Sequence, residues 1–155
     1  MAPPSPVAPF LVLWCERPVF ERLADQTRRW STRPAVRADG RELTYGALDA
    51  LTRHVCSTMA GRPARDGAVA LLFEKGVAFA GALLGLLRAG IVAVPLDPSF
   101  PPANLGFMLE DTGARRILTD RRHAALAAEL GGEVILVDPF DFEAGPRIPE
   151  TTPPA

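Results

Sequence analysis

The sequence predicts an α/β fold, built on a mostly parallel sheet with β-α-β crossovers and a short hairpin near residues 35–43. Continuous apolar runs alternate with helical patterns from residue 68 onward, which is typical of parallel strands covered by helices on both faces. Asp39-Gly40 separates two short extended runs, and this dipeptide suits the positive φ angles of a tight hairpin turn. With 155 residues, 48% hydrophobic and 23% charged, the chain can bury the core of one domain.

The first half of the chain predicts two helices, one on each side of the hairpin. Apolar residues recur at three- and four-residue spacing over 19–30 with charged residues between them, and Pro34 ends this helix. After the hairpin, Thr44 is expected to cap a helix of about 45–60. The buried face of this second helix is predicted to carry Leu48, Leu51, Val55 and Met59.

The second half predicts strands that alternate with helices. After a loop at 61–67, the predicted strands are 68–74, 91–97, 115–120 and 133–138. The helices between them are predicted at 77–90, from Pro101-Pro102 to a C-cap at Gly113, and at 121–130. Right-handed crossovers between parallel strands follow from this order.

Proline marks both ends of the chain. Ten of the sixteen prolines lie in residues 1–18 or 139–155, and proline fixes φ and removes a hydrogen-bond donor. The sequence therefore predicts a Pro-rich N-terminal segment (1–18), a compact region (19–138) and a Pro-rich tail or linker (139–155). Both ends are expected to be extended or disordered.

Charge and cysteine content argue against several classes of function. The formal net charge is −1, so the chain lacks the positive excess that a general grip on nucleic acid or an acidic membrane needs. Cys15 and Cys56 are too few for a disulfide framework and are predicted to be idle thiols in a reducing compartment. No signal peptide is apparent, and the apolar stretch 77–87 is shorter than the roughly 20 residues of a membrane span. These features predict a cytoplasmic protein.

The common motifs for phosphate binding and for a hydrolase nucleophile are absent from the sequence. It contains no G-x-x-x-x-G-K-[ST], no G-x-G-x-x-G and no G-x-S-x-G. Gly81 and Gly85 do form a G-x-x-x-G. In a soluble helix this spacing is predicted to let the helix approach a strand closely, rather than to form a membrane dimer.

The titratable residues suggest no catalytic group. His54 and Cys56 are two positions apart on a predicted helix and face different ways. His123 follows two arginines and is expected to have no matched carboxylate for acid–base work. Glu110-Asp111 is interpreted as a solvated helix end, because adjacent helical positions do not face each other.

Lys75, the single lysine of the chain, follows a predicted buried strand. The carboxyl end of such a strand is where open α/β sheets place ligands, but the expected role of Lys75 is that of a solvated loop residue. The residues themselves therefore lead us to assign no catalytic, cofactor-binding or metal-binding residue.

Three segments carry a resemblance to a known family. LTYGAL (43–48), LLRAGIVAVPLDPSFP (86–101) and FMLEDTGARRILTD (107–120) resemble the opening motifs of the adenylation domains of nonribosomal peptide synthetases. These domains belong to the AMP-dependent synthetase/ligase family of adenylate-forming enzymes, together with acyl-CoA ligases and luciferases. The resemblance covers about 19–138, which would then be a truncated N-terminal subdomain of an adenylation domain. The PLDPxxP form is more similar to the amino-acid-activating branch.

The resemblance implies an activity for full-length relatives. They use ATP and Mg²⁺ to convert a carboxylate to an acyl-adenylate, release pyrophosphate, and pass the acyl group to the phosphopantetheine of a carrier protein. The family's phosphate loop, substrate pocket and C-terminal catalytic lysine have no counterpart in this sequence, and Lys75 does not match that lysine. We therefore expect the chain alone to be inactive and to bind no cofactor.

Two alternatives remain open at this point. The chain could be a stand-alone interaction module that docks on a synthetase or complements the remainder of an adenylation domain. It could also be a truncated acyl-CoA or aryl-acid ligase. In each case the expected partners are parts of a synthetase or a carrier protein, and not nucleic acid or membrane.

One departure from the family pattern concerns the cap at Thr44. The family often has Glu three residues later, which completes a capping box, whereas this chain has Ala47. From the sequence, Ala47→Glu is expected to stabilise the second helix by roughly 0.5–1 kcal/mol.

Overall fold

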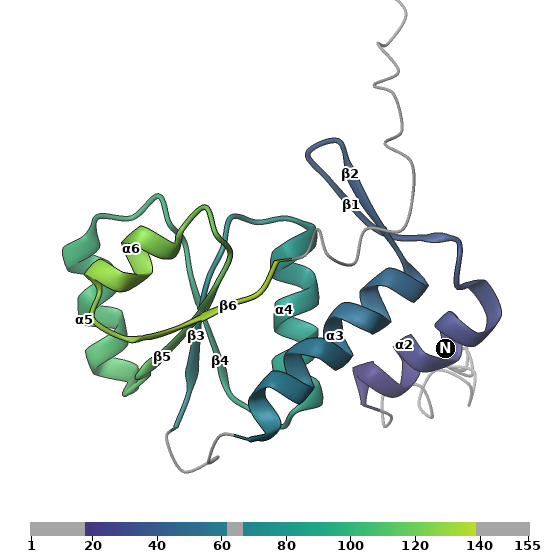
Figure 1. Ribbon diagram of the computed structural model, residues 1–155, viewed down its shortest axis with the longest axis horizontal. Helices are drawn as coiled ribbons and strands as arrows, with labels where there is room; N and C mark the ends of the chain where they lie inside the picture. Colours follow the sequence, from purple (N-terminus) through teal and green to yellow (C-terminus); the bar gives the residue numbers. More distant parts are fainter. Residues whose placement is uncertain (1–17, 62–66, 139–155) are drawn as a thin grey trace, which may run out of the picture.

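The computed structural model describes residues 18–61 and 67–138 (Figure 1). The elements, in chain order, are α2 (Val19–Trp30), β1 (Pro34–Ala38), β2 (Arg41–Thr44), α3 (Tyr45–Ala60), β3 (Val69–Leu72), α4 (Val77–Arg88), β4 (Ala93–Leu96), α5 (Pro102–Thr112), β5 (Arg116–Thr119), α6 (Ala124–Glu129) and β6 (Glu133–Leu136). The expectations for the Pro-rich ends, for Cys15 and for most of the 61–67 loop lie outside the described residues.

The four-stranded sheet is parallel throughout, with strand order β4-β3-β5-β6. Val69 at the start of β3 is aligned with Ala93 of β4 and with Arg116 of β5. Every residue of β3 and of β5 is buried, which explains why these strands read as continuous apolar runs. The α/β fold class predicted from the sequence is confirmed.

Helices cover both faces of this sheet (Figure 1). One core cluster joins α2, α3 and α4 to side chains such as Leu71 and Leu118. The other joins α5 and α6 to Leu72 and Ile117. The alternation of strand side chains between the two clusters follows from the two-residue period of a strand.

The predicted hairpin is confirmed. β1 and β2 pair in antiparallel fashion, and the turn residues Asp39 and Gly40 have φ angles of 51° and 70°, as a type I′ turn requires. The side chains of Arg37 and Glu42 form an ion pair across the two strands. The hairpin therefore has a well-defined turn that leads directly into α3.

The predicted caps of two helices are also confirmed. The Thr44 hydroxyl accepts a hydrogen bond from the backbone N–H of Ala47 at 3.2 Å and so caps α3. Gly113 ends α5 in the left-handed conformation, with φ 67°. The last helix begins three residues later than expected, at Ala124, because the Asp120 carboxylate accepts a hydrogen bond from the His123 N–H at 3.0 Å and holds the intervening residues in a turn.

The burial of Ala47 reverses the effect expected for Ala47→Glu. Ala47 is only 8% exposed and belongs to the core cluster beneath α3. A glutamate there would bury part of a charged side chain, so we expect the free energy of unfolding to fall by about 1–3 kcal/mol. A urea titration of the variant measures this change. A urea midpoint above that of the wild type would instead favour the capping-box expectation.

Gly81 and Gly85 are packing residues, but they face a helix and not a strand. An added Cβ at Gly81 would lie 2.1 Å from Cδ2 of Leu51, and one at Gly85 would lie 2.4 Å from Cβ of Val55. Both neighbours belong to α3. The expected close approach to a strand is therefore wrong, because α3 lies over the face of α4 that carries the two glycines.

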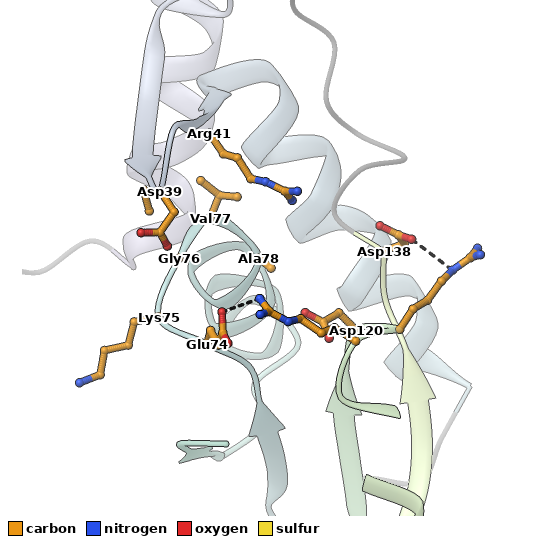
Figure 2. Close-up of a pocket in the computed structure, with 12 residues that line it drawn as sticks. Asp39, Arg41, Glu74, Lys75, Gly76, Val77, Ala78, Asp120 and Asp138 are labelled. Atoms are coloured by element: carbon orange, nitrogen blue, oxygen red, sulfur yellow. Dashed lines mark hydrogen bonds and ion pairs between the residues drawn. The ribbon is translucent and has the colours of Figure 1, made fainter. Parts of the chain in front are cut away.

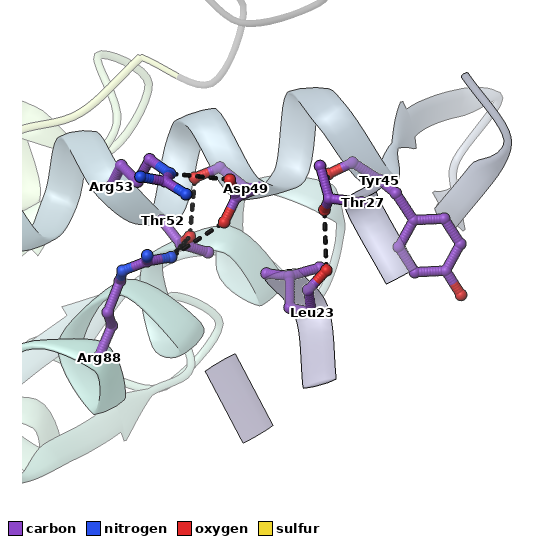
Figure 3. A network of polar contacts seen from close by, with 7 residues as sticks. All are labelled: Leu23, Thr27, Tyr45, Asp49, Thr52, Arg53 and Arg88. Carbon is purple, nitrogen blue, oxygen red and sulfur yellow. Dashed lines mark hydrogen bonds and ion pairs between the residues drawn. The ribbon is translucent and has the colours of Figure 1, made fainter. Parts of the chain in front are cut away.

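A polar network joins the same two helices (Figure 3). The carboxylate of Asp49 in α3 accepts hydrogen bonds from Arg88 at 2.9 Å, at the end of α4, and from Arg53 at 2.8 Å. Arg88 also donates to the Thr52 hydroxyl at 3.3 Å. Asp49 and Thr52 are both buried, so this network fixes the pairing of α3 and α4 at one end.

Within residues 18–61 and 67–138, no helix combines the length and apolar character that crossing a membrane requires.

Candidate functional site

A cavity of about 310 Å³ lies at the carboxyl edge of the parallel sheet, below the turn of the hairpin (Figure 2). Open α/β sheets place their ligands at this edge. The lining residues come from the hairpin and from the segments that follow β3, β5 and β6; they are Ala38, Asp39, Arg41, Glu74, Lys75, Gly76, Val77, Ala78, Asp120, Arg121, Arg122 and Asp138.

Each strand of the sheet is followed by a carboxylate. Asp97 follows β4, Glu74 follows β3, Asp120 follows β5 and Asp138 follows β6, each within two residues of the end of the strand. Because parallel strands end at the same edge, these acidic residues share one side of the sheet. Asp97 and Asp120 also start turns, since their carboxylates accept backbone N–H groups two and three residues later.

Arginines balance two of these carboxylates. Arg122 lies 2.8 Å from Glu74, and Arg121 lies 3.2 Å from Asp138, measured between side-chain nitrogen and oxygen. Both arginine side chains are more than 70% exposed, so each pair contributes at most about 1 kcal/mol to stability. The pairs link the segments after β3, β5 and β6 but leave the lining without a strong net charge.

His123 has the carboxylate partners that the sequence was expected to lack. Its Nδ1 lies 2.8 Å from Oδ1 of Asp120, and its Nε2 lies 3.9 Å from Oε1 of Glu74. The expectation is wrong because Asp120 starts the turn before α6 and brings its carboxylate back over His123. The spacing Asp-x-x-His after a predicted strand was the signal that could have revealed this contact.

The other titratable residues singled out in the sequence stay apart from one another. Lys75 is exposed in the turn after β3, and in Figure 2 its side chain points away from the cavity that its segment lines. His54 is exposed, Cys56 is partly buried, and Glu110 and Asp111 are exposed near the end of α5. Among the described residues, no group of three or more His, Cys, Asp or Glu side chains could hold a metal ion.

The sequence did not reveal the cavity. Asp39 and Arg41 lie far along the chain from Asp120 and Asp138, and only tertiary packing brings the hairpin turn above the ends of the strands. Acidic and basic groups both line it, and two of its carboxylates are already paired with arginine. Such a lining does not fit a triphosphate, which requires an excess of positive charge or backbone N–H groups.

We expect Asp97 to titrate below an ordinary aspartate. Hydrogen bonds from the backbone N–H and then the hydroxyl of Ser99 lower the pKa of the Asp97 carboxyl, and Lys75 contributes a smaller attraction. An NMR titration should give a midpoint below 3.8, and Ser99→Ala should raise it toward that value. Any stability from this contact is present above the unfolded pKa and is lost as the pH falls through the folded pKa. A wild-type midpoint at or above 3.8 would contradict the prediction.

The comparison with known families turns this geometry into an assignment. The family described as AMP-binding enzyme matches residues 23–155, which is most of the chain. The chain belongs to the AMP-binding enzyme family.

Similar proteins place this AMP-binding chain more narrowly. One of the plipastatin synthase polypeptides of Bacillus subtilis is 34% identical over 140 residues, which cover 90% of this chain and 5% of the relative. Naringenin synthase of Pestalotiopsis fici is 40% identical over 101 residues, covering 63% of this chain and 4% of that relative. The chain thus spans about one-twentieth or less of these two relatives.

A solved structure matches the fold as well. The nonribosomal peptide synthetase FmoA3 (S1046A), bound to α-methyl-L-serine-AMP, superimposes with a TM-score of 0.68 at 32% identity, over 84% of this chain and 15% of that one. The AMP-binding chain therefore corresponds to the N-terminal portion of a synthetase adenylation domain. LTYGAL forms the end of β2 and the start of α3, and the PLDP segment carries the end of β4 and Asp97.

Proposed function

We propose that this chain supplies the N-terminal scaffold of an adenylation domain that activates an amino acid for nonribosomal peptide synthesis. The observation that carries the proposal is the 34% identity to a plipastatin synthase polypeptide across 90% of the chain. In the complete enzyme, ATP and Mg²⁺ would convert the amino acid to an aminoacyl-adenylate with release of pyrophosphate, in the cytoplasm. A carrier protein would then receive the aminoacyl group.

The chain by itself is proposed to be inactive. Its carboxyl-edge cavity offers paired charges instead of a phosphate cradle, and the described titratable residues form no substrate pocket of the family's kind. The proposed contribution is structural. The sheet and its crossovers hold the hairpin and the strand ends on which the remainder of an adenylation domain builds.

ATP–pyrophosphate exchange tests both parts of this proposal. The chain alone should give no exchange above background with any amino acid. The same chain joined to the remainder of an adenylation domain from one of its relatives should give exchange with at least one amino acid. Exchange by the chain alone would overturn the proposed inactivity. Exchange by the joined protein with aryl or fatty acids only would favour the acyl-CoA or aryl-acid ligase alternative.

One observation favours the second candidate, an interaction module. Val92, just before edge strand β4, is 68% exposed, and Leu136 in edge strand β6 is 52% exposed. Edge strands and apolar side chains of this kind pair with a partner or aggregate. Size-exclusion chromatography separates the two candidates, because a module should elute as a defined species or complex and a fragment as aggregates.

A further inference from the structure

A second hollow lies where α2 ends and β1 begins, and it shares no residue with the carboxyl-edge cavity. Its lining residues are Gln26, Trp30, Arg33, Pro34, Ala35, Arg37 and Tyr45, and we call it the Trp30 groove. Trp30 is 42% exposed, and the Arg33 guanidinium stacks on its ring at 3.7 Å from the centroid. In Figure 3 the ring of Tyr45 points away from the polar network between α3 and α4.

The chemistry of the groove suits a proline-rich ligand. Aromatic rings provide flat surfaces for proline rings, as in other grooves that bind polyproline II segments. Gln26, Arg33 and Tyr45 provide hydrogen-bond donors, and the indole N–H of Trp30 provides another. A polyproline II segment has no internal hydrogen bonds and exposes its carbonyl groups as acceptors. No carboxylate is among the lining residues, so the groove offers no partner for a basic ligand.

The N-terminal segment of the same chain has the matching pattern. In the run PPSPVAP, Pro3, Pro6 and Pro9 recur at every third residue, which places them on one face of a polyproline II helix because that helix has three residues per turn. Residues 1–15 contain no charged side chain. The segment thus brings neither a basic group that the groove would repel nor an acidic group that would need a separate explanation.

The segment is also long enough to reach the groove. Trp30 is the last residue of the 12-residue helix α2, about 18 Å from the start of that helix at 1.5 Å per residue. The nine residues from Pro9 to Pro18 can span up to about 30 Å when extended. The segment can therefore run back along α2 and place Pro3, Pro6 and Pro9 at the groove.

We propose that residues 3–9 dock in the Trp30 groove of their own chain as a polyproline II segment. The rings of Trp30 and Tyr45 receive the prolines, and Gln26 and Arg33 donate to the segment's carbonyl groups. This docking is independent of the adenylation proposal, because it uses none of the residues at the carboxyl edge of the sheet. Tethering within one chain supplies a high effective concentration, so a weak contact suffices.

Paramagnetic broadening in the full-length chain tests the docking. A nitroxide is attached at Ser5→Cys, with Cys15→Ser and Cys56→Ala to remove the native thiols, and Trp14→Phe identifies the indole signal of Trp30. We expect the label to remove most of the intensity of the Trp30 indole and Tyr45 amide signals and to spare Phe107, which lies on α5. An excess of a synthetic peptide of residues 1–10 should restore the lost intensity.

The matched control changes only the segment. Replacing Pro3, Pro6 and Pro9 with glycine keeps the tether but removes the polyproline II bias, and it alters no residue of the two core clusters. Equal broadening in wild type and control would mean that the tether alone brings the label near, and would overturn the proposal. Absence of broadening would overturn it too. Broadening of Trp30 only from a label at Thr152→Cys would assign the groove to the C-terminal segment and would also overturn the proposal.

Discussion

Gly85→Ala should lower the free energy of unfolding by about 3 kcal/mol, the upper part of the usual range for overpacking a core. The new Cβ would lie 2.4 Å from Cβ and 2.6 Å from Cγ1 of Val55, and 3.2 Å from the backbone oxygen of Thr52. Val55 is fully buried, and its Cβ is fixed to the backbone of α3, so relief requires the two helices to separate. Urea denaturation monitored by circular dichroism measures the loss.

Two other glycines calibrate this result. Gly81→Ala meets Cδ2 of Leu51 at 2.1 Å, but the end of a leucine side chain can turn, so we expect a smaller loss than at Gly85. Gly106 lies inside α5, and an added Cβ there would meet no neighbouring atom within 4 Å, so Gly106→Ala should stabilise the fold by up to about 1 kcal/mol. If Gly85→Ala and Gly106→Ala changed stability equally, the direct α3–α4 contact would be refuted.

Asp49→Ala should lower the free energy of unfolding by about 3 kcal/mol, the loss typical of a buried ion pair that loses one partner. The Asp49 side chain is only 10% exposed and that of Arg88 only 19%. Without the carboxylate, the Arg88 guanidinium would keep the Thr52 hydroxyl as its one remaining contact within the network of Figure 3. The urea midpoint is again the measurement.

Arg53→Ala is the control for this network. Arg53 contacts the same carboxylate at 2.8 Å, but its side chain is 62% exposed, so its removal should cost less than about 1 kcal/mol. A double-mutant cycle between Asp49→Ala and Arg88→Ala isolates the coupling of the pair. Equal losses for Asp49→Ala and Arg53→Ala, with no coupling to Arg88, would mean that the buried pair does not hold α3 against α4.

The order of the elements could be predicted from the sequence because it depends on local patterns. Helical and strand periods, the Asp39-Gly40 turn and the cap at Thr44 are all encoded within a few residues. The partner of Gly81 and Gly85 could not be predicted, because a G-x-x-x-G shows that something approaches closely but not what. The burial of Ala47 was also hidden, since alanine is common on both faces of a helix.

The candidate site was harder to predict because its residues come together only in the folded chain. The segments after β3, β5 and β6 are separated by long stretches, and the hairpin turn contributes from the first third of the chain. Lys75 stands out in the sequence as the single lysine, yet its side chain points away from the cavity in Figure 2. The contact between His123 and Asp120 is local, and it was missed because the turn before α6 was interpreted as helix.

The strand order β4-β3-β5-β6 has a further consequence at the carboxyl edge. The chain winds outward from β3 to β4, then crosses back and winds in the opposite direction through β5 and β6, so α4 lies on one face and α5 and α6 on the other. Such a reversal usually opens a crevice between the two central strands. Here the Thr119 hydroxyl of β5 donates to the Leu72 carbonyl of β3 at 2.7 Å. This buried hydrogen bond closes the base of the crevice, so Glu74 and Asp120 stand on a sealed floor.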